Sequence, residues 1–260
     1  MKPNFREELM KWGIGLVSLL AFCSVAQNLS IEVDDTWPAE FRQEVETILE
    51  EAAEKIWEHL DPKPNYKIVV RYDSAGPMVL YREYSSLPDD TVEMLLNPDL
   101  TVSGFKAQLI FQFGHEFGHV IQDYNRLRST ESKNNWLHES LCELLAIWLL
   151  KAEGEGQIID SFRARSIQLM EQIRDWKPFI QATEELLRDN GYARKLNAMI
   201  AYKLYPAFKE NPKLFNAFRF LPKSDSELEK YLEEWADNAT KSFSDELVEE
   251  IKEVLFQEHE

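Results

Sequence analysis

The spacing of apolar residues divides the chain into a mixed front part and a helical rear part. Apolar residues recur every three or four positions, as in amphipathic helices, in three segments: 36–60, 103–124 and 136–150. Short runs rich in β-branched and aromatic residues, bounded by turn signals, predict three strands: 66–72, 78–84 and 91–96. Helical periodicity prevails after residue 158. The pattern therefore predicts an α+β fold with a helical C-terminal half.

The change from a mixed to a helical pattern also predicts the domain organisation. A chain of 260 residues is long enough for one large domain or two small ones. We expect a core at 27–155 that contains a small mixed sheet and three helices, followed by a helical subdomain at 156–260. The sequence shows neither an internal repeat nor a low-complexity linker between them.

The segment 1–26 has the pattern of a secretory signal. Basic residues precede an apolar run at 13–25, and small side chains stand at Ser24 and Ala26, the two positions that a signal peptidase inspects. We expect cleavage after Ala26 and an extracytoplasmic location, either secreted or periplasmic. Two alternatives keep the protein at a membrane: the segment stays as an uncleaved anchor, or Cys23 is lipidated.

The excess of acidic over basic side chains argues against some classes of binding partner. There are 46 acidic and 29 basic side chains, a net charge of −17. Phosphate contacts need clustered Lys and Arg, so this balance argues against nucleic acid and against a polybasic membrane surface. Cleavage of the signal leaves Cys142 as the only cysteine, which excludes an internal disulfide. Oligomeric state is not predicted.

The string His115-Glu116-Phe117-Gly118-His119 fits the pattern H-E-x-x-H. Residues four apart share one face of a helix, so both imidazoles can reach one ion. Glu116 is rotated by about 100° from His115 and can act as a general base on a water at the metal. Zinc accepts this mixture of nitrogen and carboxylate ligands. The competing interpretation is two core histidines on an ordinary amphipathic helix.

Two glycines flank the histidines at Gly114 and Gly118. Each destabilises a helix by about 1 kcal/mol relative to Ala. We expect that they let a strand or a substrate backbone approach the helix closely.

A catalytic zinc site needs a third protein ligand. A metzincin site requires Gly at 122 and His at 125, but the chain has Gln122 and Asn125. The best candidate is Glu139, twenty residues beyond the second histidine, and its neighbours His138 and Glu143 are alternatives. If Glu139 is the ligand, Glu143 can accept the second N–H of a ligand histidine. Cys142 shares the face of Glu139, and such a cysteine is usually a small buried side chain.

These strings resemble the gluzincin zinc metallopeptidases. HEFGH followed by WLHESLCE is similar to the thermolysin-like pattern of HExxH and then NExxSD, and WLHES is closer to the WLNEG of aminopeptidase N-like enzymes. Asp123 and Tyr124 also resemble the residues after the thermolysin-like motif. The resemblance covers mainly 104–150. It departs from the pattern where His138 replaces Asn and Glu143 replaces Asp, and the chain has no GAMEN-like exopeptidase string.

The resemblance implies a zincin-like core and a role for each matching residue. The roles are those of zinc ligands (His115, His119 and Glu139), general base (Glu116) and hydrogen-bond partner of a ligand (Glu143). Similarity to the aminopeptidase N-like enzymes adds Tyr192 as the residue that stabilises the oxyanion.

The resulting hypothesis is zinc-dependent hydrolysis of a peptide or protein substrate. The peptide is expected to pair with an edge strand, either 78–84 or 91–96. The alternative is a domain with the same zinc ligands that binds a peptide or a partner without cleaving it. A third possibility is a metal-free helical interaction protein.

Overall fold

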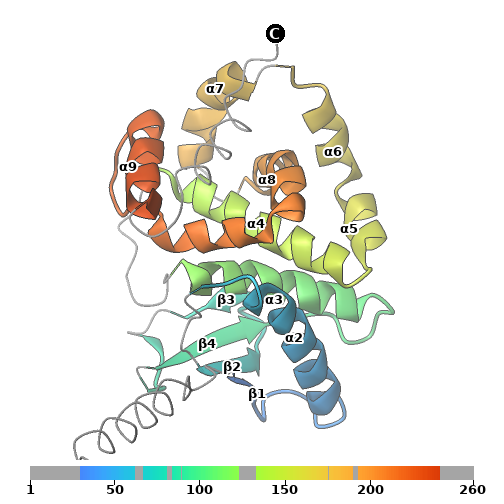
Figure 1. Cartoon of the computed structure of the whole chain (residues 1–260). Helices are drawn as coiled ribbons and strands as arrows, with labels where there is room; N and C mark the ends of the chain where they lie inside the picture. Colours follow the sequence, from blue (N-terminus) through green and yellow to red (C-terminus); the bar gives the residue numbers. More distant parts are fainter. Residues whose placement is uncertain are drawn as a thin grey trace, which may run out of the picture.

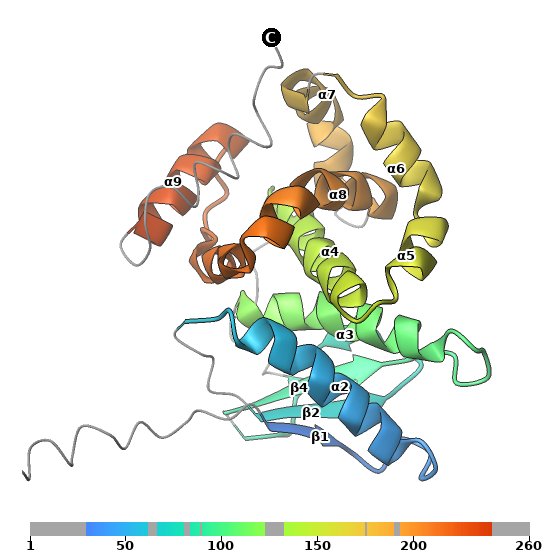
Figure 2. The same cartoon turned by 45° about the vertical axis from the view of Figure 1, so that its right-hand side comes forward.

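The computed structural model (Figures 1 and 2) describes seven stretches of the chain: 30–61, 67–80, 84–88, 90–122, 133–174, 176–189 and 193–240. The structural statements below concern these stretches. The predicted signal segment 1–26, the pair Asp123-Tyr124 and the predicted Tyr192 lie outside them. The predicted mixture of a small sheet with many helices is confirmed.

A four-stranded mixed sheet forms one side of the molecule, and its strand order is β1-β2-β4-β3. Its strands are β1 (Ser30–Val33), β2 (Lys67–Tyr72), β3 (Met78–Val79) and β4 (Thr91–Leu96). The strands β1, β2 and β4 are neighbours and run parallel, and β3 is antiparallel to β4. Parallel neighbours need a crossover, which a helix supplies between β1 and β2.

The predicted strands differ from the observed ones in two respects. β2 and β4 match the predicted runs, whereas the described part of the run 78–84 pairs only at Met78–Val79. The short β1 was not predicted. Its four residues, SIEV, begin three residues after the predicted leader and are too few to show an alternation of apolar and polar positions.

Eight α-helices and one 3₁₀-helix occupy most of the described chain. They are α2 (Arg42–Trp57), α3 (Phe105–Ile121), α4 (Asn135–Ala152), α5 (Gly156–Phe162), α6 (Ala164–Glu171), α7 (Trp176–Asp189), α8 (Arg194–Glu210), η3 (Pro212–Phe220) and α9 (Leu228–Thr240). Figures 1 and 2 show them in layers. The helices α2 and α3 lie on the sheet, α4 lies on α3, and α8 lies on α4.

The sheet buries one face against α2 and α3 because its apolar residues stand in register. Ile31 pairs with Ile68, which pairs with Val92, and this row is buried. Two residues further along, Val70 pairs with Met94 on the same face, and both are buried. The alternate positions include charged residues that form the ion pairs Lys67–Glu32 and Arg71–Glu93, so one face packs on helices and the other carries ion pairs.

The helix α4 is buried on opposite sides, and most of its buried residues are apolar. Thirteen of its eighteen residues are buried, between α3 on one side and α8 on the other. A helix with so many buried apolar residues belongs in the centre of a core. The buried apolar side chains form one cluster that extends from Ile31 to Trp235, through the sheet and the C-terminal helices.

The helices α3 and α4 approach each other closely at the two glycines of α3. A Cβ atom on Gly114 would lie 2.8 Å from the Cα of Ala146, and one on Gly118 would lie 2.9 Å from the Cα of Cys142. These separations are shorter than side chains tolerate. The expectation that a strand or a substrate approaches the glycines is wrong, because the space beside them is filled by α4.

In the described stretches, no helix combines the length and the apolar character that crossing a membrane requires.

We predict that Gly114→Ala destabilises the protein, although alanine favours a helix. The added methyl meets the backbone of α4, which cannot rotate away, and overpacking of this kind costs about 1–3 kcal/mol. The gain in helix propensity is about 1 kcal/mol. Denaturant unfolding is expected to show a net loss. Gly104→Ala is the matched control, because nothing lies within 4 Å of its added Cβ. Equal stability of both variants would contradict the close helix contact.

Candidate metal centre

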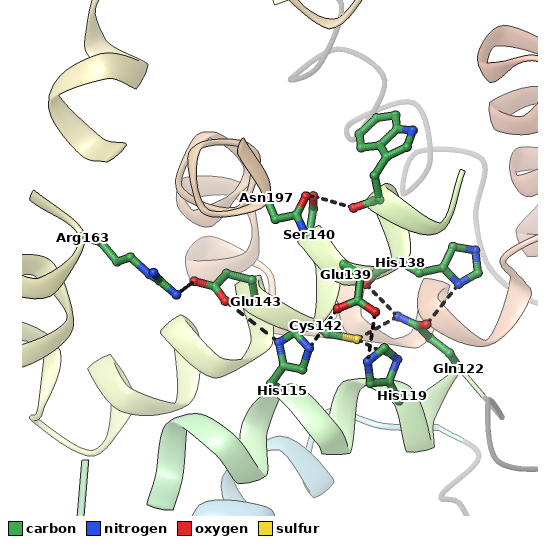
Figure 3. A network of polar contacts seen from close by, with 11 residues as sticks. His115, His119, Gln122, His138, Glu139, Ser140, Cys142, Glu143, Arg163 and Asn197 are labelled. Carbon is green, nitrogen blue, oxygen red and sulfur yellow. Dashed lines mark hydrogen bonds and ion pairs between the residues drawn. The ribbon is translucent and has the colours of Figure 1, made fainter. Parts of the chain in front are cut away.

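Three side chains from α3 and α4 converge at the interface of these helices. His115 and His119 lie one turn apart on α3 and point toward Glu139, in the first turns of α4 (Figure 3). The Nε2 atom of His115 is 3.1 Å from one Glu139 oxygen, and the Nε2 atom of His119 is 3.5 Å from the other. The predicted set of two histidines and Glu139 is thus brought together.

This cluster has the donors and the spacing that one metal ion needs. One atom from each of the three side chains lies within 4.8 Å of the others. Ligands at about 2.1 Å around a tetrahedral ion are themselves about 3.4 Å apart. The measured 3.1 and 3.5 Å are close to that value. The group His115, His119 and Glu139 can therefore hold a metal ion.

The far side of His115 faces a buried ion pair. Its Nδ1 atom is 4.0 Å from one oxygen of Glu143, and the other oxygen of Glu143 is 2.7 Å from a guanidinium nitrogen of Arg163. The side chains of Glu143 and Arg163 are only 7% and 13% exposed. Glu143 therefore lies behind a candidate ligand, but the 4.0 Å separation is too long for the predicted hydrogen bond, which stays a prediction. Its pairing with Arg163 opposes the alternative in which Glu143 binds the metal.

His138 is directed away from the cluster. Its Nδ1 atom is 3.1 Å from the Gln122 side-chain oxygen, and its Nε2 atom is 2.6 Å from the hydroxyl of Tyr231 on α9. Because both ring nitrogens have partners elsewhere, the alternative in which His138 is the third ligand has no support in the geometry.

Glu116 lies beside the cluster and contacts the sheet. Its side chain is buried, and the backbone N–H of Val79 on β3 donates a hydrogen bond to its carboxylate. The N–H of Leu80 bonds instead to the Glu93 carbonyl on β4, so Val79 presents its N–H to the outside of the sheet.

The strand β3 is consequently the edge beside the site. The expectation that 91–96 can serve as an edge strand is wrong, because β4 pairs with β2 on one side and with β3 on the other. The strand order of the sheet depends on tertiary structure and has no local signal.

Burial and neighbouring charges shift the pKa values of the acidic and basic side chains around the cluster, and the directions differ from residue to residue. Burial raises the pKa of Glu116 to about 7, with a further upward contribution from Glu139. Burial lowers the pKa of His119 to about 4. Burial also opposes the charge on His115, but the hydrogen bond with Glu139 and three nearby carboxylates outweigh it and raise the pKa of His115 to about 9.

The sequence did not identify two of the residues around the cluster. Arg163 lies between α5 and α6, far from the motif along the chain, and no local pattern marks it. In the sequence, Gln122 serves only to exclude a metzincin site. Its position three residues after His119 places it on the same face of α3, and this spacing is the signal that marks it as a neighbour of the cluster.

Comparison with known proteins gives no relative of this chain. No family profile matches the sequence, and neither the curated proteins nor the solved structures contain one that is significantly similar.

We predict that metal binding releases a proton from His115. At pH 7 the metal-free side chain is charged, because its pKa is about 9, whereas a ligand must be neutral. The affinity for zinc should therefore rise about tenfold per pH unit from pH 7 until it levels near pH 9. Calorimetric titration in buffers of different ionisation enthalpy counts the released protons. Binding with no proton release and no dependence on pH over this range would contradict the prediction.

We also predict that Arg163→Met destabilises the protein by about 3 kcal/mol, at the lower end of the cost of removing one partner of a buried ion pair. The substitution leaves the Glu143 carboxylate buried without its counter-ion. Arg165→Met is the matched control, because Arg165 is exposed and its side chain donates a hydrogen bond to Gln168 on its own helix. Thermal and denaturant unfolding measure both variants. A similar small effect of the two substitutions would show that the pair with Glu143 contributes little.

Proposed function

We propose that the protein is a zinc-dependent metallopeptidase of gluzincin type. The observation that carries the proposal is the position of Glu116. It is a buried carboxyl next to a cluster of two histidines and a glutamate, and it is bound to an edge strand. A site that only stabilises the fold has no use for such a base and usually surrounds its metal with protein ligands. The resemblance of HEFGH and WLHESLCE to gluzincins supports the same assignment.

In the proposed reaction Glu116 moves protons. A general base works best when its pKa lies near the working pH, and in the metal-free protein burial raises the pKa of Glu116 toward that range. It accepts a proton from the attacking water and passes it to the leaving amine. The N–H of Val79 holds one position of the carboxylate, which orients the remaining lone pairs. Zinc, when bound to His115, His119 and Glu139, supplies Lewis-acid chemistry by polarising the scissile carbonyl and acidifying water.

The substrate is proposed to lie along β3. In its described part, β3 pairs on one side with β4, which leaves its other side for an extended peptide. Solvent reaches the cluster through His115 and Glu139, whose side chains are 20% and 14% exposed. The proposal for Tyr192 as oxyanion stabiliser rests on the resemblance alone.

We predict close to one zinc per chain after reconstitution of the full chain. Both His119→Ala and Glu139→Ala should lose it, because each removes one of three ligands. His59→Ala is the histidine control, because its ring packs on Trp148 and lies outside the cluster. Metal analysis after dialysis gives the content. Absence of zinc from the reconstituted wild type, or its retention by both ligand variants, would refute the assignment.

We further predict that Glu116→Gln retains zinc and loses peptidase activity by about 100- to 10,000-fold, the usual contribution of a general base. Glutamine keeps the shape of the side chain but cannot accept the proton. Fluorescent casein and a quenched peptide library are suitable substrates, with the exposed Glu50→Gln on α2 as control. Full activity in Glu116→Gln would exclude the mechanism. A zinc-loaded wild type that cleaves nothing would instead favour the alternative of a zinc-holding binding domain.

A further inference from the structure

His119 is held from both sides of its ring. Its Nε2 atom faces Glu139 at 3.5 Å, while its Nδ1 atom lies 3.4 Å from the sulfur of Cys142 on α4 (Figure 3). A histidine that binds a metal through one nitrogen carries its proton on the other, and the partner of that proton fixes the tautomer and the orientation of the ring. Cys142 thus occupies the position of such a partner, on the side of the ring opposite to the metal.

The sulfur reaches this position because of Gly118. A Cβ atom on Gly118 would lie 2.8 Å from the Cys142 sulfur, so any larger residue would displace it. The side chain of Cys142 is fully buried, and its sulfur faces the Nδ1 atom of His119 rather than the Nε2 side, where the candidate ligands meet. A sulfur in this position can accept a hydrogen bond from an Nδ1–H group.

Gln122 holds the sulfur in place from the end of α3. Its amide nitrogen is 3.3 Å from the Cys142 sulfur and 3.3 Å from the His138 carbonyl oxygen, while its amide oxygen is 3.1 Å from the His138 Nδ1 atom. Every polar group of the amide has a partner, which fixes its orientation with the N–H groups toward the sulfur. His138 is anchored in turn by Tyr231.

We propose that Cys142 and Gln122 are positioning residues that hold His119 in the tautomer that binds a metal. The Nδ1–H group of His119 donates to the Cys142 sulfur, and the Nε2 lone pair points to the metal. The inference rests on the proposed function, because it treats His119 as a ligand. It assigns Cys142 a role beyond that of a small buried side chain and makes Gln122 part of the metal centre.

The test compares Cys142→Ala with Cys142→Ser in the full chain. Alanine removes the acceptor, so the affinity for zinc, measured by competition with a chelator, should fall about 10- to 100-fold. Serine restores an acceptor and should recover most of the affinity. Ser140→Ala is the matched control. It also removes one buried heteroatom from α4, but the Ser140 hydroxyl bonds to the Trp136 carbonyl rather than to a ligand.

A second measurement reports on the hydrogen bond itself. In the zinc-loaded protein, the Nδ1–H proton of His119 should exchange slowly with solvent in the wild type and in Ser140→Ala, and faster in Cys142→Ala, because alanine offers it no acceptor. A purely structural role would lower the unfolding midpoint of Cys142→Ala and leave this exchange unchanged.

The contribution of Gln122 is tested by a double-mutant cycle. Gln122→Leu should weaken zinc binding in the wild type and should add little in the Cys142→Ala background, because its effect passes through the sulfur. Wild-type zinc affinity and unchanged Nδ1–H exchange in Cys142→Ala would overturn the inference while leaving the proposed function intact. If the wild type binds no zinc, the proposed function fails, and the role of Cys142 fails with it.

Discussion

The close packing of α3 on α4 is the constraint on which the rest of the site depends. The histidines belong to one helix and the glutamate to the other, so their convergence requires the helix axes to approach closely. Gly114 and Gly118 permit this because Ala146 and Cys142 fill the space where their side chains would be. The resulting contact brings the Glu139 oxygens to 3.1 and 3.5 Å from the two imidazoles. The same two glycines weaken the helix that carries the motif, so the interface with α4 must supply the compensating stability.

The second constraint is electrostatic. The site gathers three carboxylates and two imidazoles in a buried region of a protein whose net charge is −17. Arg163 offsets part of this charge through Glu143, and Phe111 and Phe162 lie 5.6 and 5.2 Å from its guanidinium carbon. Aromatic rings attract a cation but do not hydrate it. The positive charge of Arg163 therefore stays beside Glu143. A divalent cation bound between the candidate ligands would offset the remaining negative charge.

The parts of the site that depend on local spacing were predictable from the sequence, and those that depend on tertiary placement were not. The spacing of His115, Glu116 and His119 fixes their directions on a helix, and the string around Glu139 indicated the third member. Arg163 lies in the turn between the short helices α5 and α6, and no repeating pattern in the sequence marks this position. The strand order, which makes β3 the edge and β4 an inner strand, is likewise a property of the whole sheet.

The hydrogen bond between Val79 and Glu116 has a consequence for how the protein behaves in concentrated solution. An edge strand with free N–H and C=O groups invites the edge of another molecule, which is a common route to aggregation. Here the outward N–H of Val79 is already bound by the Glu116 carboxylate, and the described pairing of β3 covers only two residues. Within the described residues, a chain that lies along this edge can therefore pair with the outward carbonyl of Val79, whereas the N–H of Val79 becomes available only when Glu116 releases it. The carboxylate to which we assign proton transfer thus also controls which backbone group of the edge strand can pair, whether with a substrate or with a second molecule.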